Sequence, residues 1–71
     1  MILDARGHRC PVPSLRLRKA LETAGPGDRV TLLADDPMAR IDVPHLVAQL
    51  GARLIEQSQE GDYLSFVVEK S

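Results

Sequence analysis

The chain of 71 residues has very little cysteine and very few aromatic residues: one Cys, one Tyr, one Phe and no Trp. A single cysteine, Cys10, cannot close a disulfide within the chain, so its thiol either stays reduced or pairs with another molecule. No apolar run approaches the roughly 18 residues of a membrane span, and the N-terminal residues lack the cationic start and apolar stretch of a secretory signal. We therefore expect a cytoplasmic protein that makes no use of a membrane.

The charge balance excludes a further class of partner. Nine Lys and Arg stand against ten Asp and Glu, giving a net charge of −1, whereas proteins that bind the phosphate backbone carry a strong basic excess. Direct binding to nucleic acid is therefore not expected. With 44% hydrophobic and 27% charged residues, the composition is that of one ordinary globular domain spanning residues 1–71.

Hydrophobic periodicity predicts the first helix and four strands. Ile2 and Leu3 begin a short strand that ends at Asp4, and apolar residues at helical spacing predict a helix over about residues 13–24. Alternating apolar residues predict strands at 29–34, 53–57 and 63–69, the last two joined through residues 58–62 as an antiparallel hairpin. In the final strand we expect three residues to face the helices: Leu64, Phe66 and Val68.

The second helix has two candidate starts in the sequence. Asp36 precedes Pro37, and Asp42 precedes Val43-Pro44, so each resembles an N-cap followed by an early proline. A proline at position 44 would break a helix already running from position 37. We therefore favour a helix that starts at Val43 and stops at Gly51, with a turn-rich connection over residues 36–42.

The element order βαβαββ predicts an α/β (α+β) two-layer sandwich. Right-handed crossovers place successive helices on the same side of a sheet when the strands progress in one direction. We expect both helices to cover one face of a four-stranded sheet. Tyr63 and Val67 would then lie on the other face, where a partner or a second copy could bind.

The single cysteine lies where the first strand ends and the first helix begins. It stands in the run Asp4-Ala5-Arg6-Gly7-His8-Arg9-Cys10-Pro11-Val12-Pro13. A helix N-terminus and nearby cations both lower the pKa of a thiol from about 8.5, which raises the fraction of nucleophilic thiolate. Arg6 and Arg9 are the best candidates for those cations, with Arg16 further along the helix. Cys10 is therefore the candidate catalytic residue.

Other side chains near Cys10 have weaker cases. His8 could serve as a base or, when protonated, as a stabilising charge, although no third orienting group of the triad type is evident. Pro11 and Pro13 fix the backbone on either side of Val12 and stiffen the segment. A structural zinc site requires about four ligands, and His8 with Cys10 makes one poor pair, so we expect no metal.

Three aspartates fit capping better than acid-base chemistry, because each precedes or nearly precedes a turn marked by proline. They are Asp35, Asp36 and Asp42.

The motif Cys10-Pro11-Val12-Pro13 is followed by four further characteristic runs: Leu17-Arg18-Lys19-Ala20-Leu21, Pro26-Gly27-Asp28, Ala34-Asp35-Asp36-Pro37 and Asp42-Val43-Pro44. With them, nearly the whole chain resembles the TusA family of sulfur carriers, also called SirA-like. The resemblance implies a mixed sheet with strand order 1-2-4-3. It also implies that Cys10 accepts a sulfane sulfur as a persulfide and passes it to another protein, with no cofactor besides that sulfur.

The resemblance further implies two kinds of protein partner. The donor would be a cysteine desulfurase or a rhodanese-like protein, and the acceptor would belong to tRNA thiolation, molybdenum-cofactor synthesis or sulfur oxidation. Val12 stands where tRNA-thiolation members often have an acidic residue, and Val43-Pro44-His45 departs from their Ile-Pro-Gly run. Both differences count against the tRNA pathway more than against the carrier role. Residues expected to stabilise the persulfide or dock partners are Arg6, His8, Arg9, Pro11, Pro13 and Arg16.

Two other functions remain open from the sequence. In one, Cys10 is structural and the chain is a non-catalytic interaction or regulatory module that binds a protein through the open sheet face. In the other, Cys10 is a redox sensor that passes through sulfenic acid and an intermolecular disulfide.

Overall fold

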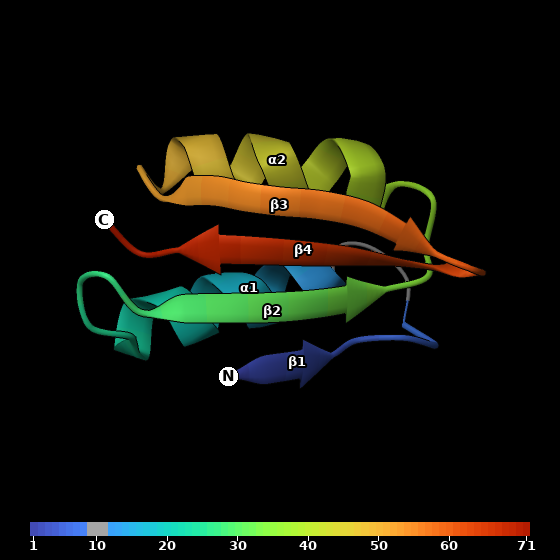
Figure 1. The fold of residues 1–71 in the computed structure, drawn as a ribbon, viewed down its shortest axis with the longest axis horizontal. Coiled ribbons are helices and arrows are strands. Elements are labelled where there is room, and N and C mark those ends of the chain that lie inside the picture. Colours follow the sequence, from blue (N-terminus) through green and yellow to red (C-terminus); the bar gives the residue numbers. More distant parts are fainter. Residues whose placement is uncertain (9–11) are drawn as a thin grey trace.

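Four strands form one mixed sheet in the computed structural model, which describes residues 1–8 and 12–71 (Figure 1). The strands are β1 (Ile2–Asp4), β2 (Arg29–Ala34), β3 (Arg53–Glu60) and β4 (Tyr63–Glu69), and the helices are α1 (Val12–Thr23) and α2 (Ala39–Gln49). The order across the sheet is β1-β2-β4-β3, with β1 parallel to β2 and the other neighbours antiparallel. Both helices lie behind the sheet in Figure 1, on one face. The predicted fold class and strand order are therefore confirmed.

The hydrophobic core lies between the two helices and the two central strands. Every second residue of β4 is buried, which confirms the predicted inward face, and Phe66 at 0% exposure is the largest buried side chain. Phe66 lies opposite Leu32 of β2, and the helices cover this pair with Leu17 and Val43, which are also fully buried. Neither helix is long and apolar enough to cross a membrane, as far as the described residues go.

The second helix begins at Ala39, so the predicted start at Val43 is wrong. Pro44 lies inside α2, where it cannot donate to the carbonyl of Arg40 one turn earlier. The helix forms despite this lost hydrogen bond because Ala39, Val43 and Val47, spaced four residues apart, all pack into the core. Tertiary packing thus outweighs the local preference that the prediction relied on.

The turn before α2 is fixed by Asp36, which was the alternative start. Its carboxylate accepts the backbone N–H of Met38 at 3.0 Å, and its carbonyl accepts the N–H of Ala39 at 3.0 Å. Asp36 therefore fixes the turn marked by Pro37, but it is not the N-cap of the helix, which is Met38 and has no side-chain capping hydrogen bond.

The final hairpin is tighter than predicted. β3 continues to Glu60, and only Gly61 and Asp62 connect it to β4, so the predicted strand 53–57 was too short. Gly61 has a φ of 66°, which suits the first position of a two-residue hairpin turn. A register shift between Leu54 and Glu56 changes which side chains face the helices, and this shift hides the strand's alternation in the sequence.

Candidate functional site

The described residues around the predicted site lie at one end of the sheet, near the ends of β1 and β2 and the start of α1. β1 and β2 are parallel, so their carboxyl ends lie at the same edge of the sheet, and both helices begin at that end of the molecule (Figure 1). The Cys10 segment, residues 5–11, connects β1 to α1 there. Arg9, Cys10 and Pro11 lie outside the described residues, so the roles assigned to them remain predictions.

The first half of the Cys10 segment is attached to the end of β2. Ala5 is fully buried, and its N–H donates to the carbonyl of Leu33 at 2.8 Å. Gly7 has a φ of 84°, a left-handed conformation that favours glycine. Its N–H donates to the Oδ2 atom of Asp35 at 2.9 Å, and His8 N–H donates to the Ala5 carbonyl at 3.3 Å. The backbone therefore turns sharply at Gly7 and is held by Asp35.

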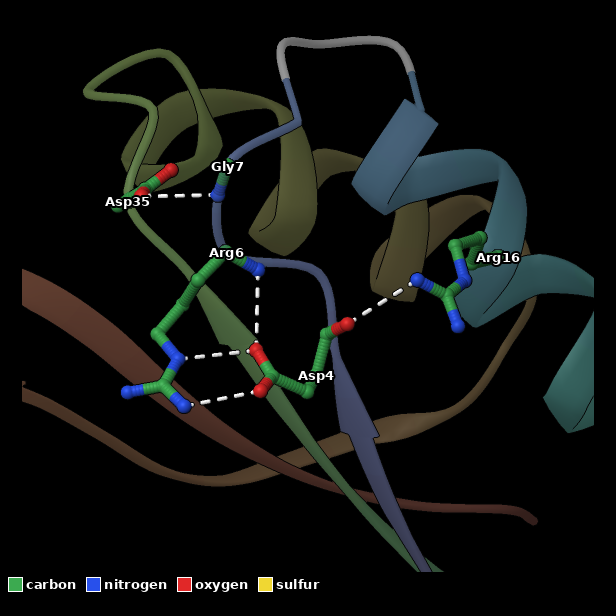
Figure 2. A network of polar contacts seen from close by, with 5 residues as sticks. All are labelled: Asp4, Arg6, Gly7, Arg16 and Asp35. Atoms are coloured by element: carbon green, nitrogen blue, oxygen red, sulfur yellow. Dashed lines mark hydrogen bonds and ion pairs between the residues drawn. The ribbon is translucent and has the colours of Figure 1, made fainter.

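Arg6 is paired with Asp4 rather than left free. The Asp4 carboxylate accepts three hydrogen bonds from Arg6, from the backbone N–H at 3.1 Å and from Nε and Nη2 at 2.9 Å each (Figure 2). These bonds lower the pKa of Asp4 to about 2, and the carboxylate raises the pKa of Arg6 in turn. The guanidinium also lies 4.9 Å from the ring centroid of Tyr63. Asp4 thus compensates much of the positive charge of Arg6, which was expected to lower the pKa of the Cys10 thiol.

Arg16 has a different environment. It extends from α1 and donates from Nη1 to the backbone carbonyl of Asp4 at 3.0 Å, which ties the start of the helix to the end of β1 (Figure 2). A carbonyl is neutral, and no ion pair joins Arg16 to another described residue. Arg16 therefore acts on the nearby Asp4 carboxylate only through space, where it helps to lower the pKa of that group.

The remaining predicted site residues differ in exposure. His8 is exposed and lines a hollow of about 260 Å³ together with Gly7, Asp35, Asp36 and Pro37. Pro13 is fully buried, so any effect on a partner would act through the position of α1 and not through contact. The structure thus brings Arg6, His8 and Arg16 to one end of the sheet, where β1 ends and α1 begins.

Four exposed apolar side chains, not anticipated from the sequence, lie near the starts of the two helices at this end of the molecule. Val12 and Leu15 on the first turn of α1 are 38% and 57% exposed, and Met38 and Ile41 around the start of α2 are 51% and 65% exposed. Exposed apolar groups gathered around a site are typical of surfaces that bind other proteins. We call these four residues the apolar rim.

Sequence reasoning also missed the two carboxylates that bind the segment. Asp35 was expected to cap a turn, yet it binds Gly7, which lies 28 residues earlier. The parallel pairing of β1 and β2 was the available signal, because it brings the residues that follow both strands to one edge of the sheet. Asp4 binds Arg6, only two positions away, and the prediction that Arg6 supplies a cation to Cys10 left this pairing out.

Comparison with known proteins agrees with the geometry. The family model described as sulfurtransferase TusA matches residues 1–70. A putative sulfur carrier protein from Archaeoglobus fulgidus is 45% identical over 93% of this chain and 87% of its own. Sulfur carrier protein TusA from Pseudomonas aeruginosa is 38% identical over 99% of this chain and 90% of its own.

A solved structure is also similar. The SirA-like protein from Desulfitobacterium hafniense superposes with a TM-score of 0.83 at 29% identity, covering 97% of this chain and 96% of that one. The family model, the relatives and the fold therefore agree, and the chain belongs to the sulfurtransferase TusA family.

Proposed function

We propose that this protein is a sulfur carrier that holds a sulfane sulfur as a persulfide on Cys10. The relatives are named sulfur carriers, and Cys10 is the only cysteine in the chain. A sulfur atom bound through cysteine can therefore be held at one position alone. That single position is the observation that carries the proposal.

The proposed loading step is a thiol–persulfide exchange. The Cys10 thiolate attacks the outer sulfur of a persulfide on the donor protein, a cysteine desulfurase or a rhodanese-like protein. One S–S bond forms on Cys10, the donor's S–S bond breaks, and the donor cysteine leaves as a thiolate while the proton stays on the outer sulfur. The exchange conserves charge and needs no external oxidant or reductant. The same exchange in the opposite sense delivers the sulfur to an acceptor protein.

The positive field for this chemistry comes from Arg16 and the N-terminus of α1. Unpaired N–H groups give a helix N-terminus a partial positive charge that stabilises anions, and α1 begins two residues after Cys10. Arg16 lies in the second turn of that helix and forms no ion pair with any described residue. Arg6 contributes less, because Asp4 neutralises its guanidinium.

Donor and acceptor are proposed to dock in turn on the apolar rim. Its four side chains come from the beginnings of both helices, which flank the Cys10 segment. One shared surface would also separate loading from delivery, because two proteins cannot occupy it together. The carrier must then leave its donor before it meets its acceptor.

Intact-mass analysis tests the proposal. After incubation with a cysteine desulfurase and cysteine, the wild type should gain about 32 Da, the mass of one transferred sulfur, and Cys10→Ser should gain nothing. Equal gains would move the sulfur away from Cys10. No mass gain with a cysteine desulfurase or with a persulfide-bearing rhodanese-like protein would favour the non-catalytic interaction or regulatory module.

Arg16→Gln tests the source of the field, with Arg18→Gln as a matched control. Arg18 lies on α1 but lines a separate hollow with Leu50 and Lys70. The pH midpoint of Cys10 alkylation by iodoacetamide should rise in Arg16→Gln and stay unchanged in Arg18→Gln. Equal shifts in both variants would replace a local field with a general charge effect.

A further inference from the structure

We infer that Asp35 is a positioning residue for Cys10, acting through the backbone of Gly7. This inference depends on the proposed function only in that Cys10 is taken as the reacting group. Asp35 directly follows the last residue of β2, and its Oδ2 atom accepts the Gly7 N–H at 2.9 Å (Figure 2). Gly7 lies three residues before Cys10.

The Asp35 contact completes the attachment of the segment's first half to β2. Ala5 is bound to the carbonyl of Leu33 and is buried, so the segment has a fixed departure point. Two residues later, Gly7 adopts its positive φ while its N–H points to Asp35. Without this second attachment, the turn would keep the His8 N–H contact to Ala5 at 3.3 Å and the bonds of Arg6 to Asp4, none of which reaches β2.

The second flank of the segment is fixed independently of Asp35. Pro13 is fully buried in α1, and Arg16 binds the Asp4 carbonyl from the same helix. The helix side therefore stays in place when the Gly7 contact is lost. The path into Cys10 from β1 is the part that Asp35 controls, which gives its substitution a local effect.

A purely electrostatic role for Asp35 predicts a different pattern among the Asp35 variants from a positioning role. A carboxylate near a thiol opposes thiolate formation, so loss of its charge would make Cys10 easier to deprotonate. Asp35→Asn and Asp35→Ala would then act alike. A positioning role predicts that they differ, because the Asn amide oxygen can still accept the Gly7 N–H, though less strongly than a carboxylate does.

Asp28→Ala is a matched control at the other end of the sheet (Figure 1). Its Oδ2 atom accepts the N–H of Gly25 at 2.9 Å, a bond of the same type and length in an equally exposed turn. Asp28 follows α1 and precedes β2, far from the Cys10 segment. Its removal should cost similar stability without affecting Cys10.

The experiment compares the three variants with the wild type, using the pH profile of Cys10 alkylation and the exchange rate of the Gly7 amide. In Asp35→Ala, Gly7 exchange should accelerate about tenfold or more, and the alkylation rate at neutral pH should change about threefold or more. In Asp35→Asn and Asp28→Ala, alkylation should stay within about twofold of the wild type.

Three results would overturn the inference: unchanged alkylation in Asp35→Ala, equal changes in both Asp35 variants, or an equal change in Asp28→Ala. Alkylation requires no sulfur donor, so the outcome is separate from that of the proposed function. A wild type that takes up no sulfur would end the carrier proposal, while the role of Asp35 would still be decided by these rates.

Discussion

Replacing Gly7 with alanine should damage the Cys10 segment without touching the core. Gly7 has a φ of 84°, and a Cβ atom added there would meet no heavy atom within 4 Å. The substitution therefore introduces no steric clash with the rest of the protein. Its whole cost comes from holding an L-amino acid in a left-handed backbone conformation.

The size of that cost follows from the conformation. A left-handed conformation costs an alanine about 1–2 kcal/mol, and alanine returns less than about 1 kcal/mol by restricting the unfolded chain. The net loss in the free energy of unfolding is then about 1 kcal/mol, or a fall in Tm of about 4–8 °C for a domain of this size. Rotating φ to relieve the strain would break the Gly7 bond to Asp35, so the segment changes path in part of the population.

Gly27→Ala separates loss of stability from loss of function. Gly27 has a φ of 87°, and an added Cβ would likewise meet nothing within 4 Å. It lies in the turn between α1 and β2, at the opposite end of the sheet from the Cys10 segment (Figure 1). The two variants should therefore lose similar Tm in thermal unfolding. Only Gly7→Ala should slow sulfur loading, measured as the initial rate of mass gain.

Two results would refute this reasoning. A Gly7→Ala variant as stable as the wild type would mean that residue 7 does not require a left-handed conformation. Equal slowing of sulfur loading in Gly7→Ala and Gly27→Ala would mean that general stability, and not the path of the segment, controls Cys10.

Three further predictions concern the scaffold. Phe66→Ala should lower the free energy of unfolding by about 3–5 kcal/mol. The total expected for 71 residues is about 4–11 kcal/mol, so urea unfolding should show a marginally stable or unfolded protein. Pro44→Ala restores a donor to the Arg40 carbonyl and should raise stability by about 1–2 kcal/mol, seen as a higher Tm; an unchanged Tm would contradict it. Arg6 lowers the pKa of Asp4 to about 2, whereas the pKa of Asp in an unfolded chain is near 3.9. The pair therefore stabilises the fold above about pH 3.9, and this stabilisation is lost as the pH falls toward 2. In acid titrations, the stability difference between wild type and Asp4→Asn should shrink over that range.

The sequence predicts the fold well where one face of an element is strongly apolar. Leu64, Phe66 and Val68 alternate without interruption in β4, and the predicted inward face is confirmed. Prediction failed where a local rule competed with tertiary packing. Pro44 argued for a late helix start, but the buried residues before it keep that turn helical. In β3 the bulge after Leu54 broke the alternation on which the predicted length depended.

The candidate site was predictable only where its features are local in the sequence. The run around Cys10 is local, so its cations, its prolines and the helix that follows were visible in the sequence. The bond between Gly7 and Asp35 spans 28 residues and exists only because β1 and β2 pair in parallel. Contacts of this kind require the register of the sheet, which no short motif contains.

The two arginines show why the position of a charge matters more than its nearness in sequence. Arg6 is closer to Cys10 along the chain, but its guanidinium meets the Asp4 carboxylate at 2.9 Å, so at longer range the pair acts as a dipole and not as a cation. Arg16 is further away in sequence, yet its side chain reaches from α1 to the end of β1, where it donates to the neutral carbonyl of Asp4. Among the described residues it forms no ion pair, and it acts on the Asp4 carboxylate only through space. For the proposed anionic persulfide, the stabilising charge is therefore expected from the helix that follows the cysteine and not from the strand that precedes it.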